Sequence, residues 1–511
     1  MHQPPHLTLL ACLAAGAALL AGCSTRTDVS LTGNTPGQYS HVFVTVQEVW
    51  FNADANAGPD DSGWNKFTLS TPSTVDLVAQ NGGNLGSIAS GLRVPVATYS
   101  QVRLIPVDAS AALADSAKNA GALFNFEADY VDSSNKLQQL PLELLNPDKG
   151  LGIQTSLKVP VGNVGTGLPF GAVAGNSAAA NNTATSGTNS NPFGTGGGTT
   201  GAATPFAGSG STSTTPNNSF AAALDGNSAL VPFAYANGTT GILWSSHAAA
   251  YDLSLAGGIS GQLTLTSITN GSSGLRVSAQ TLSADGSRHV VVAATTVASD
   301  GSFLLYPLAT NSSTTSPLSY DVVIHGPGIA TIIVKGVQVP RTASSSTGSA
   351  AASSPTNGSS NGSSGNSAGS NTPNTTNNPN VNAVAIGTLT PRAVPSYEAN
   401  VATAPGATLP AGAVVNFYQT TGSQGEVPYV IESSPIDPFN QVLFSNLALS
   451  PGTIDSGTWS TNGTVTIVSS APAEGAGTYW VAASAPGFSD GTLSKSTAVS
   501  PPPASGTAQA V

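Results

Sequence analysis

A group of oxygen-bearing residues has the spacing of a cation-binding loop. Asp54, Asn56 and Asp60 alternate with other residues, and Gly58 lies between them. Calcium loops place carboxylate and amide oxygens at such positions, and the helix–loop–helix type adds a bidentate Glu at the twelfth position. Residue 65, which takes that position here, is Asn. The stretch is therefore either a weak calcium site or a solvated turn built from Asp, Asn, Gly and Pro.

Cys23 is the second residue that carries chemistry. It closes the sequence Leu20-Ala21-Gly22-Cys23, directly after the uncharged apolar run 7–20. This resembles the lipobox of bacterial lipoproteins, which implies cleavage between Gly22 and Cys23 and acylation of Cys23, for example with palmitate. Residues 1–6 lack the Lys or Arg of an ordinary secretory signal. The alternative, a short uncleaved membrane anchor, has too few apolar residues for a span of about 20.

The remaining candidates for catalysis are scattered. After Cys23 the chain has four histidines, His41, His247, His289 and His325, and none has the spacing of a zinc site. We therefore expect no catalytic residue, no metal beyond the weak calcium candidates and no cofactor. A hydrolase would require an unrecognised pocket that joins a Ser with His247, His289 or His325 and a carboxylate.

Composition predicts the fold class and excludes some partners. Only 8% of residues are charged, so long surface helices are not expected. Short Val- and Thr-rich runs separated by Gly, Pro and Asn favour an all-β protein made of tandem β-sandwiches of immunoglobulin or transthyretin type. The net charge of −11 and the absence of a basic run exclude nucleic acid as a partner. They also disfavour direct electrostatic docking on anionic lipid.

A chain of 511 residues is too long for one core, and its low-complexity stretches suggest the boundaries. Residues 171–219 and 342–380 are almost wholly small and polar, so we expect both to be flexible. The predicted organisation is a signal peptide 1–22, a tether 23–37, a sandwich 38–255 with the insert 171–219, a second sandwich 256–341, a disordered linker 342–380 rich in Gly, Ser, Thr and Asn, a third sandwich 381–500 and a tail 501–511.

The first domain carries a recognisable order of strand signals. An alternating run over 42–51 is followed by a polar hairpin, a return strand from Trp64, the sequence Val75-Asp76-Leu77, and Tyr99-x-x-x-Arg103-Leu104. This order resembles the bacterial lipoprotein family called domain of unknown function 4382, over roughly residues 38–255. The resemblance implies a β-sandwich and no known activity.

The second and third domains look like repeats of one unit. Gly257-x-Ile259-Ser260-Gly261, Asp300-Gly301-Ser302-Phe303 and Tyr320-x-Val322 resemble carboxypeptidase-regulatory-like sandwiches of transthyretin type. Phe303–Leu308 aligns with Val442–Leu447, and Tyr320-x-Val322 with Tyr479-x-Val481. The third domain adds a hairpin around Trp459 and residues 465–468. We therefore predict duplicated modules.

Aromatic residues are the remaining candidates for ligand binding. Trp64 and Trp480 occupy strand positions where a large side chain would fill a core, whereas Trp459 is the best candidate for an exposed ring that stacks on a ligand.

Three functions remain open at this stage. The preferred one is a non-enzymatic cell-envelope protein, anchored in the outer membrane through its lipid, that serves as a structural or binding module for an unknown protein or polysaccharide. In this reading the linker lets the last module reach a partner away from the membrane. The alternatives are a carbohydrate-binding lipoprotein and, third, an unrecognised hydrolase.

Overall fold

The computed structural model of the chain describes its strands and the turns between them. The described residues are 24–35, 39–108, 111–131, 136–144, 150–160, 218–225, 230–234, 240–244, 248–268, 271–310, 317–339, 383–394, 396–402, 413–420, 427–435, 441–448, 454–460, 465–470, 479–484, 491, 494–495 and 509–510. Within them the helices are α2 (Asp115–Ala120) and the 3-10 turn η2 (Leu265–Ser267). The predicted all-β class of tandem sandwiches is confirmed.

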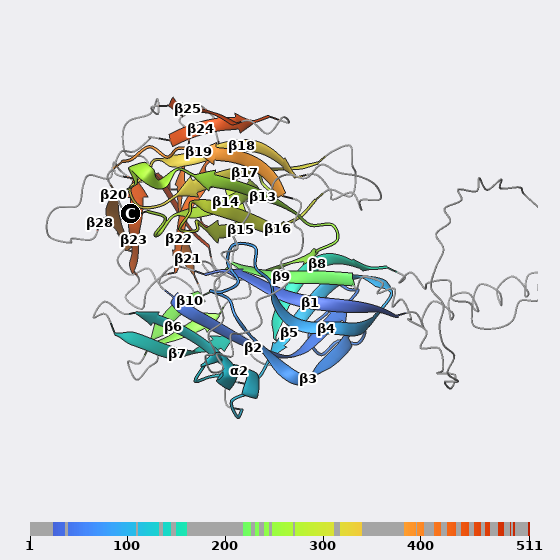
Figure 1. The fold of residues 1–511 in the computed structure, drawn as a ribbon. Helices are drawn as coiled ribbons and strands as arrows, with labels where there is room; N and C mark the ends of the chain where they lie inside the picture. Colours follow the sequence, from blue (N-terminus) through green and yellow to red (C-terminus); the bar gives the residue numbers. More distant parts are fainter. Residues whose placement is uncertain are drawn as a thin grey trace, which may run out of the picture. The chain divides into compact units, whose positions relative to one another are not determined.

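The first sandwich consists of two sheets. One has the order β12-β9-β1-β4, and the other the order β10-β11-β7-β6-β2-β5-β8 with β3 added beside β2 (Figure 1). Their bounds are β1 (Ser24–Asn34), β2 (Tyr39–Asn52), β3 (Asn65–Asp76), β4 (Gly86–Pro95), β5 (Ala97–Pro106), β6 (Phe126–Val131), β7 (Leu137–Leu144), β8 (Leu151–Val159), β9 (Asn218–Asp225), β10 (Leu230–Ala234), β11 (Thr240–Trp244) and β12 (Ala248–Asp252).

The core of this sandwich lies between the two sheets. Val42, Val44 and Val46 of β2 face this core, whereas Phe43 lies on the other face of the strand and packs against Ala117 of α2. Phe51 of one sheet meets Phe220 of the other edge to face, with ring centroids 5.4 Å apart. Both rings have 0% exposure, so this contact holds the two layers together at the centre of an apolar core.

The predicted tether is wrong for residues 24–34, which form β1. This strand lies inside its sheet, antiparallel to β4 and parallel to β9. Val29 and Leu31 are fully buried, because Thr27, Val29 and Leu31 alternate with polar residues that face outward. The first sandwich therefore begins at Ser24 and not near residue 38.

The second sandwich is built from seven strands. Its smaller sheet has the order β16-β13-β19, and its larger sheet contains β15-β14-β17-β18. The bounds are β13 (Gly257–Leu263), β14 (Arg276–Leu282), β15 (His289–Thr296), β16 (Ser302–Leu308), β17 (Leu318–His325), β18 (Thr331–Val339) and β19 (Ala383–Leu389).

The third segment repeats the same strand order, which supports the predicted duplication. Its sheets are β23-β20-β28 and β22-β21-β26-β27, so the order matches β16-β13-β19 and β15-β14-β17-β18 strand for strand. The bounds are β20 (Ser396–Ala402), β21 (Val414–Gln419), β22 (Tyr429–Pro435), β23 (Gln441–Ala448), β26 (Trp480–Ser484), β27 (Ser494–Lys495) and β28 (Gln509–Ala510).

The strand pairing moves one predicted boundary. β19 was assigned to the third domain, but it pairs in parallel with β13 and completes the second sandwich. Gly261 of β13 is tightly enclosed by both neighbouring strands, because a Cβ at this position would lie 2.5 Å from Phe303 of β16 and 2.9 Å from Ile386 of β19. The boundary therefore falls between Leu389 and Ser396, and the segment predicted as a linker connects β18 and β19 of one sandwich. Residues 171–217 and 342–380 themselves lie outside the described residues.

The extra hairpin of the third segment also joins the second sandwich. β24 (Ile454–Trp459) and β25 (Val465–Ser470) pair with each other, and β24 pairs in parallel with β18 (Figure 1). The larger sheet thus has six strands. Because these backbone hydrogen bonds tie the two segments together, the structure offers no support for a last module that reaches out on its own.

Candidate functional site

Strand β22 of the third segment lies against the outer face of the larger second-sandwich sheet. Val323 and Ile333 on that face have 0% exposure and form a small apolar cluster with Tyr429, Ile431 and Ile454. Buried and half-buried polar side chains surround this cluster. We call the region the polar seam and define it by Gln280, His289, Asp321, His325, Tyr429 and Glu432.

The side-chain amide of Gln280 on β14 bonds to the backbone of Val430 on β22, in the way that the backbone of a neighbouring strand would. Its Nε2 donates to the Val430 carbonyl at 2.6 Å, and its Oε1 accepts from the Val430 N–H at 3.0 Å. The same Nε2 also donates to Ser278 Oγ at 2.9 Å. Gln280 has 0% exposure, so these bonds satisfy an amide that would otherwise be costly to bury.

His289, Asp321 and Tyr429 form a second polar group in the seam. The His289 and Tyr429 rings stack with centroids 3.8 Å apart, and His289 Nε2 lies 3.4 Å from Asp321 Oδ2. Tyr429 Oη donates to Asp321 Oδ2 at 2.8 Å, and the Gly336 N–H donates to Oδ1 at 2.8 Å. Burial raises the pKa of Asp321, but the hydrogen bonds from His289, Gly336 and Tyr429 outweigh it and hold the pKa below its usual value.

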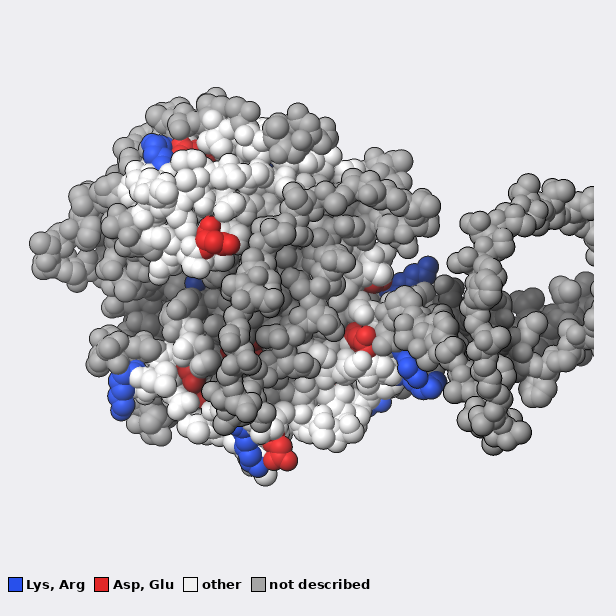
Figure 2. Space-filling view, in the orientation of Figure 1, with Lys and Arg blue, Asp and Glu red and all other residues white. Residues whose placement is uncertain are grey.

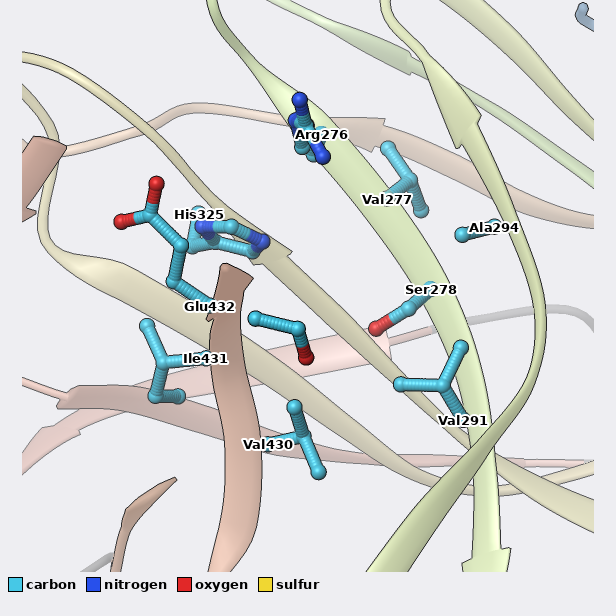
Figure 3. A pocket seen from close by; sticks show the side chains of 10 residues that line it. Arg276, Val277, Ser278, Val291, Ala294, His325, Val430, Ile431 and Glu432 are labelled. Atoms are coloured by element: carbon cyan, nitrogen blue, oxygen red, sulfur yellow. The ribbon is translucent and has the colours of Figure 1, made fainter. Parts of the chain in front are cut away.

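His325 and Glu432 line a cavity between β14, β17 and β22 (Figure 3). Burial, and then the charge of Arg276 opposite in the sheet, lowers the pKa of His325 to about 3. Burial raises the pKa of Glu432 to about 7, against the opposing effect of Arg276. The Glu432 side chain is partly exposed, but its Oε2 is buried and has no hydrogen-bond partner among the described residues, like Nδ1 of His325.

This group contains the residue types of a hydrolase but not its geometry. Ser278 and Ser433 line the same cavity, yet Ser278 Oγ accepts from Gln280 and Ser433 Oγ donates to Asn416 Oδ1 at 2.6 Å. Within the described ranges no serine hydroxyl bonds to a histidine ring. The cavity has a volume of ≈ 20 Å³, which matches one water molecule. His247 lies outside the described residues.

The predicted lipidation site also lies outside the described residues. Gly22 and Cys23 precede Ser24, the first described residue, at which β1 begins. Cys23 is therefore one peptide bond from a sheet. Among the described helices none is long and apolar enough to cross a membrane.

The weak calcium candidates form a hydrogen-bonded turn. Asp54 Oδ1 accepts from the Asn56 N–H at 2.9 Å, and Asp61 Oδ2 accepts from the Gly58 N–H at 2.8 Å. Asp60 is exposed. The bond to Asp54 is that of an Asx turn, and the bond to Asp61 closes the same loop from its other side. In the described part of the chain no three His, Cys, Asp or Glu side chains gather closely enough to hold a metal ion.

The tryptophans differ from the sequence predictions. Trp459 is half-buried and packs against the core of the second sandwich, and its Nε1 is buried without a partner among the described residues, so its ring is not the exposed platform expected. Trp64 does not fill the core of the first sandwich but lies half-buried beside Trp50, with ring centroids 5.9 Å apart. Trp480 is half-buried against Tyr418 and Val430.

The Trp50–Trp64 pair is flanked by cations. Lys66 Nζ lies 3.7 Å from the Trp50 ring centroid, and the Arg103 guanidinium carbon lies 5.3 Å from that of Trp64. The indole N–H groups donate to Glu48 and to the Gly58 carbonyl. These ring faces are thus engaged within the molecule, which gives no support to sugar stacking at this pair.

Sequence reasoning missed a pair of buried carboxylates on β6. Glu127 has 0% exposure and Asp129 has 3%. Gln139 Nε2 donates to both, and Glu127 also accepts from the Leu123 and Phe124 N–H groups. Burial, followed by the hydrogen bond with Asp129, raises the pKa of Glu127 to about 7. The alternation Glu-x-Asp, which places two carboxylates on one face of a strand, could have predicted this pair. The bonds from Leu123 and Phe124 show that Glu127 stabilises the turn after α2.

Residues 24–176 match a family model described as Domain of unknown function (DUF4382). The match starts at β1, which agrees with a first sandwich that begins at Ser24. The similarity expected for 177–255 lies beyond the matched region. No curated protein matches the chain. No solved structure matches it either. The resemblances to lipoproteins and to carboxypeptidase-regulatory-like domains stay predictions.

Proposed function

We propose that the chain is a non-enzymatic lipoprotein of the cell envelope, anchored through acylated Cys23 and carrying β-sandwiches as structural or binding modules. The observation that carries the proposal is the sequence Leu20-Ala21-Gly22-Cys23, placed directly before the strand that begins the first sandwich. A cleavage site belongs at such a position, because removal of residues 1–22 leaves β1 whole.

The location within the envelope is part of the same proposal. Ser24 follows the cysteine, where aspartate would favour retention in the inner membrane, so we assign the outer membrane. The second and third sandwiches are of carboxypeptidase-regulatory-like type in this proposal, on the sequence resemblance around Gly257–Gly261 and Asp300–Phe303. Their identical strand order supports the duplication. Their partner is a protein or a polysaccharide, and the hydrogen bonds between Gln280 and Val430 support a role of the polar seam in joining the modules.

Incorporation of labelled palmitate tests the proposal. The full chain, expressed in a bacterium that processes lipoproteins, should incorporate the label and fractionate with membranes, and Cys23→Ser should do neither. Cys12→Ser is the matched control, because Cys12 lies within the segment to be removed and is the other cysteine of the chain. Its labelling should equal that of the wild type. Equal membrane attachment of Cys23→Ser and wild type would refute the anchor.

A further inference from the structure

The first sandwich begins without a spacer after the residue proposed to carry the lipid. Ser24 is already paired with Pro95 of β4, and Thr25 with Val94. Thr25 Oγ1 donates to the Pro160 carbonyl at 2.6 Å, which ties the start of β1 to the end of β8 in the opposite sheet. We call this end, defined by Ser24, Pro95 and Pro160, the N-terminal end of the first sandwich.

We propose that the N-terminal end of the first sandwich is a membrane-contact surface that rests in the headgroup layer of a phospholipid bilayer. This inference rests on the proposed acylation of Cys23. Adjacent Cα atoms are about 3.8 Å apart, so the acylated sulfur lies within roughly 7 Å of the sheet end. One headgroup layer is about 5–8 Å thick. Acyl chains buried in the hydrocarbon therefore bring the sheet end among the headgroups.

The turn 53–64 lies at the same end. Asn52 at the end of β2 pairs with Gln101, and Gln101 Nε2 donates to the Ala55 carbonyl at 2.9 Å. Gln101 lies two residues along β5 from Tyr99, whose Oη donates to the Pro95 carbonyl at 2.8 Å. The turn thus brings half-buried Trp64 to this end. The Trp64 N–H donates to the Gly58 carbonyl, and tryptophan side chains are enriched at membrane–water interfaces.

The charges at this end are mixed in sign. Arg26 and Arg93 lie directly opposite each other on β1 and β4, Lys158 lies near the end of β8, and all three are exposed. Asp54, Asp60 and Asp61 in the turn oppose them. Figure 2 shows acidic and basic side chains scattered over the visible face, without a broad area of one sign among the described residues. Such a surface fits zwitterionic headgroups, and the acyl chains supply the affinity.

The helix α2 marks a contrasting position on the same sandwich. Ser116 of α2 bonds to Thr74, and Thr74 pairs with Thr45 of β2. Thr45 is seven residues before Asn52, the end of β2, which is about 23 Å along an extended strand. A probe on α2 should therefore stand clear of the bilayer while a probe in the turn touches it.

Short-range quenching by lipids tests this orientation. Ser62→Cys in the turn and Lys118→Cys on α2 each place a thiol at an exposed position, and acylated Cys23 does not compete for the label. Each full-length lipidated variant is labelled with a polarity-sensitive fluorophore and reconstituted into phosphatidylethanolamine–phosphatidylcholine vesicles with headgroup-labelled quencher lipid. We expect at least threefold stronger quenching at position 62 than at 118.

A spacer variant provides the matched control. Fifteen Gly and Ser residues between Cys23 and Ser24 add a reach of about 20 Å and should reduce quenching at position 62 to the value at 118. Equal quenching at the two positions in the wild type, or no effect of the spacer, overturns the inference. Mass spectrometry of each preparation reports the acyl group, so a missing lipid refutes the anchor, and a lipidated protein without the contrast refutes the orientation alone.

Discussion

The interior of the first sandwich and the polar seam are both buried, but they are held together by different forces. The first interior is apolar, with Phe51, Tyr99 and Phe220 packed ring against ring between two sheets. The seam surrounds a small apolar cluster with an amide, two histidines and two carboxylates. The stability of the apolar core depends on how closely its side chains pack. The seam instead makes the contact between the two segments specific, because each buried polar group needs a hydrogen-bond partner at a defined position.

The largest effect should come from the apolar side of this comparison. Phe51→Ala removes a fully buried ring that touches Phe67, Tyr99 and Phe220, and should destabilise the first sandwich by about 3–5 kcal/mol. Hydrogen exchange followed by mass spectrometry on the full chain should show faster exchange in β2 and β9 and unchanged exchange in β22. Faster exchange in β22 as well would mean that the two regions unfold together.

A smaller effect is expected in the seam. Gln280→Ala leaves the N–H and C=O of Val430 without their partner and should destabilise the contact of β14 with β22 by about 1–3 kcal/mol. Exchange in β22 should accelerate while β2 stays protected. Gln262→Ala is the control, because Gln262 is exposed and its single bond goes to the Asp300 carbonyl. If both variants behave alike, Gln280 is not a specific tie.

The smallest effect concerns pH. The pKa of Glu432 is raised to about 7 in the folded state, so the folded seam holds a proton that the unfolded chain releases near its ordinary pKa of 4.5. Stability should therefore fall as the pH rises from about 4.5 to 7. His325, with a pKa lowered to about 3, gives the opposite slope between about 3 and 6.5.

Glu432→Gln separates these two slopes. The variant should lose the decline between pH 4.5 and 7, an effect of about 1 kcal/mol after allowance for partial exposure. The measurement is exchange protection of β22, corrected for the intrinsic rate at each pH. Identical pH profiles for the variant and the wild type would show that the carboxyl group of Glu432 titrates normally.

Local sequence patterns were sufficient for most strands. The alternation along 42–51 predicted β2 (Tyr39–Asn52) apart from its first three residues and its last, and Tyr320-x-Val322 lies within β17. The duplication was predicted from matched turns and strand ends, and the shared strand order supports it. These predictions succeeded because the alternation of apolar and polar residues along a short segment shows which face of a strand is buried.

Pairing over long distances could not be read in the same way. The assignment of 24–34 to a tether overlooked the alternation of Thr27, Val29 and Leu31, because the strand is rich in polar residues and its partner β9 begins only at Asn218. β19 was separated from β13 because a long low-complexity stretch stands between them. No local pattern encodes the partner of a strand once such a stretch intervenes.

The polar seam was missed for a related reason. Gln280 and Val430 are 150 residues apart, and neither position is unusual in its own segment. One signal was available: Val322-Val323-Ile324 and Ile332-Ile333-Val334 are continuous apolar runs, typical of strands that are covered on both faces. Those runs indicated that something packs on the outer face of β17 and β18, but not that β22 does.

The position of β1 sets the order in which the first sheet can be completed. When a chain emerges from a translocation channel with its N-terminus first, β1 can pair with β4 early, but its other edge stays open until β9 arrives, 191 residues after Thr27. During that interval the backbone groups of the open edge can pair with a strand from another chain. Truncation before residue 218, where β9 begins, therefore leaves β1 with a permanently unpaired edge.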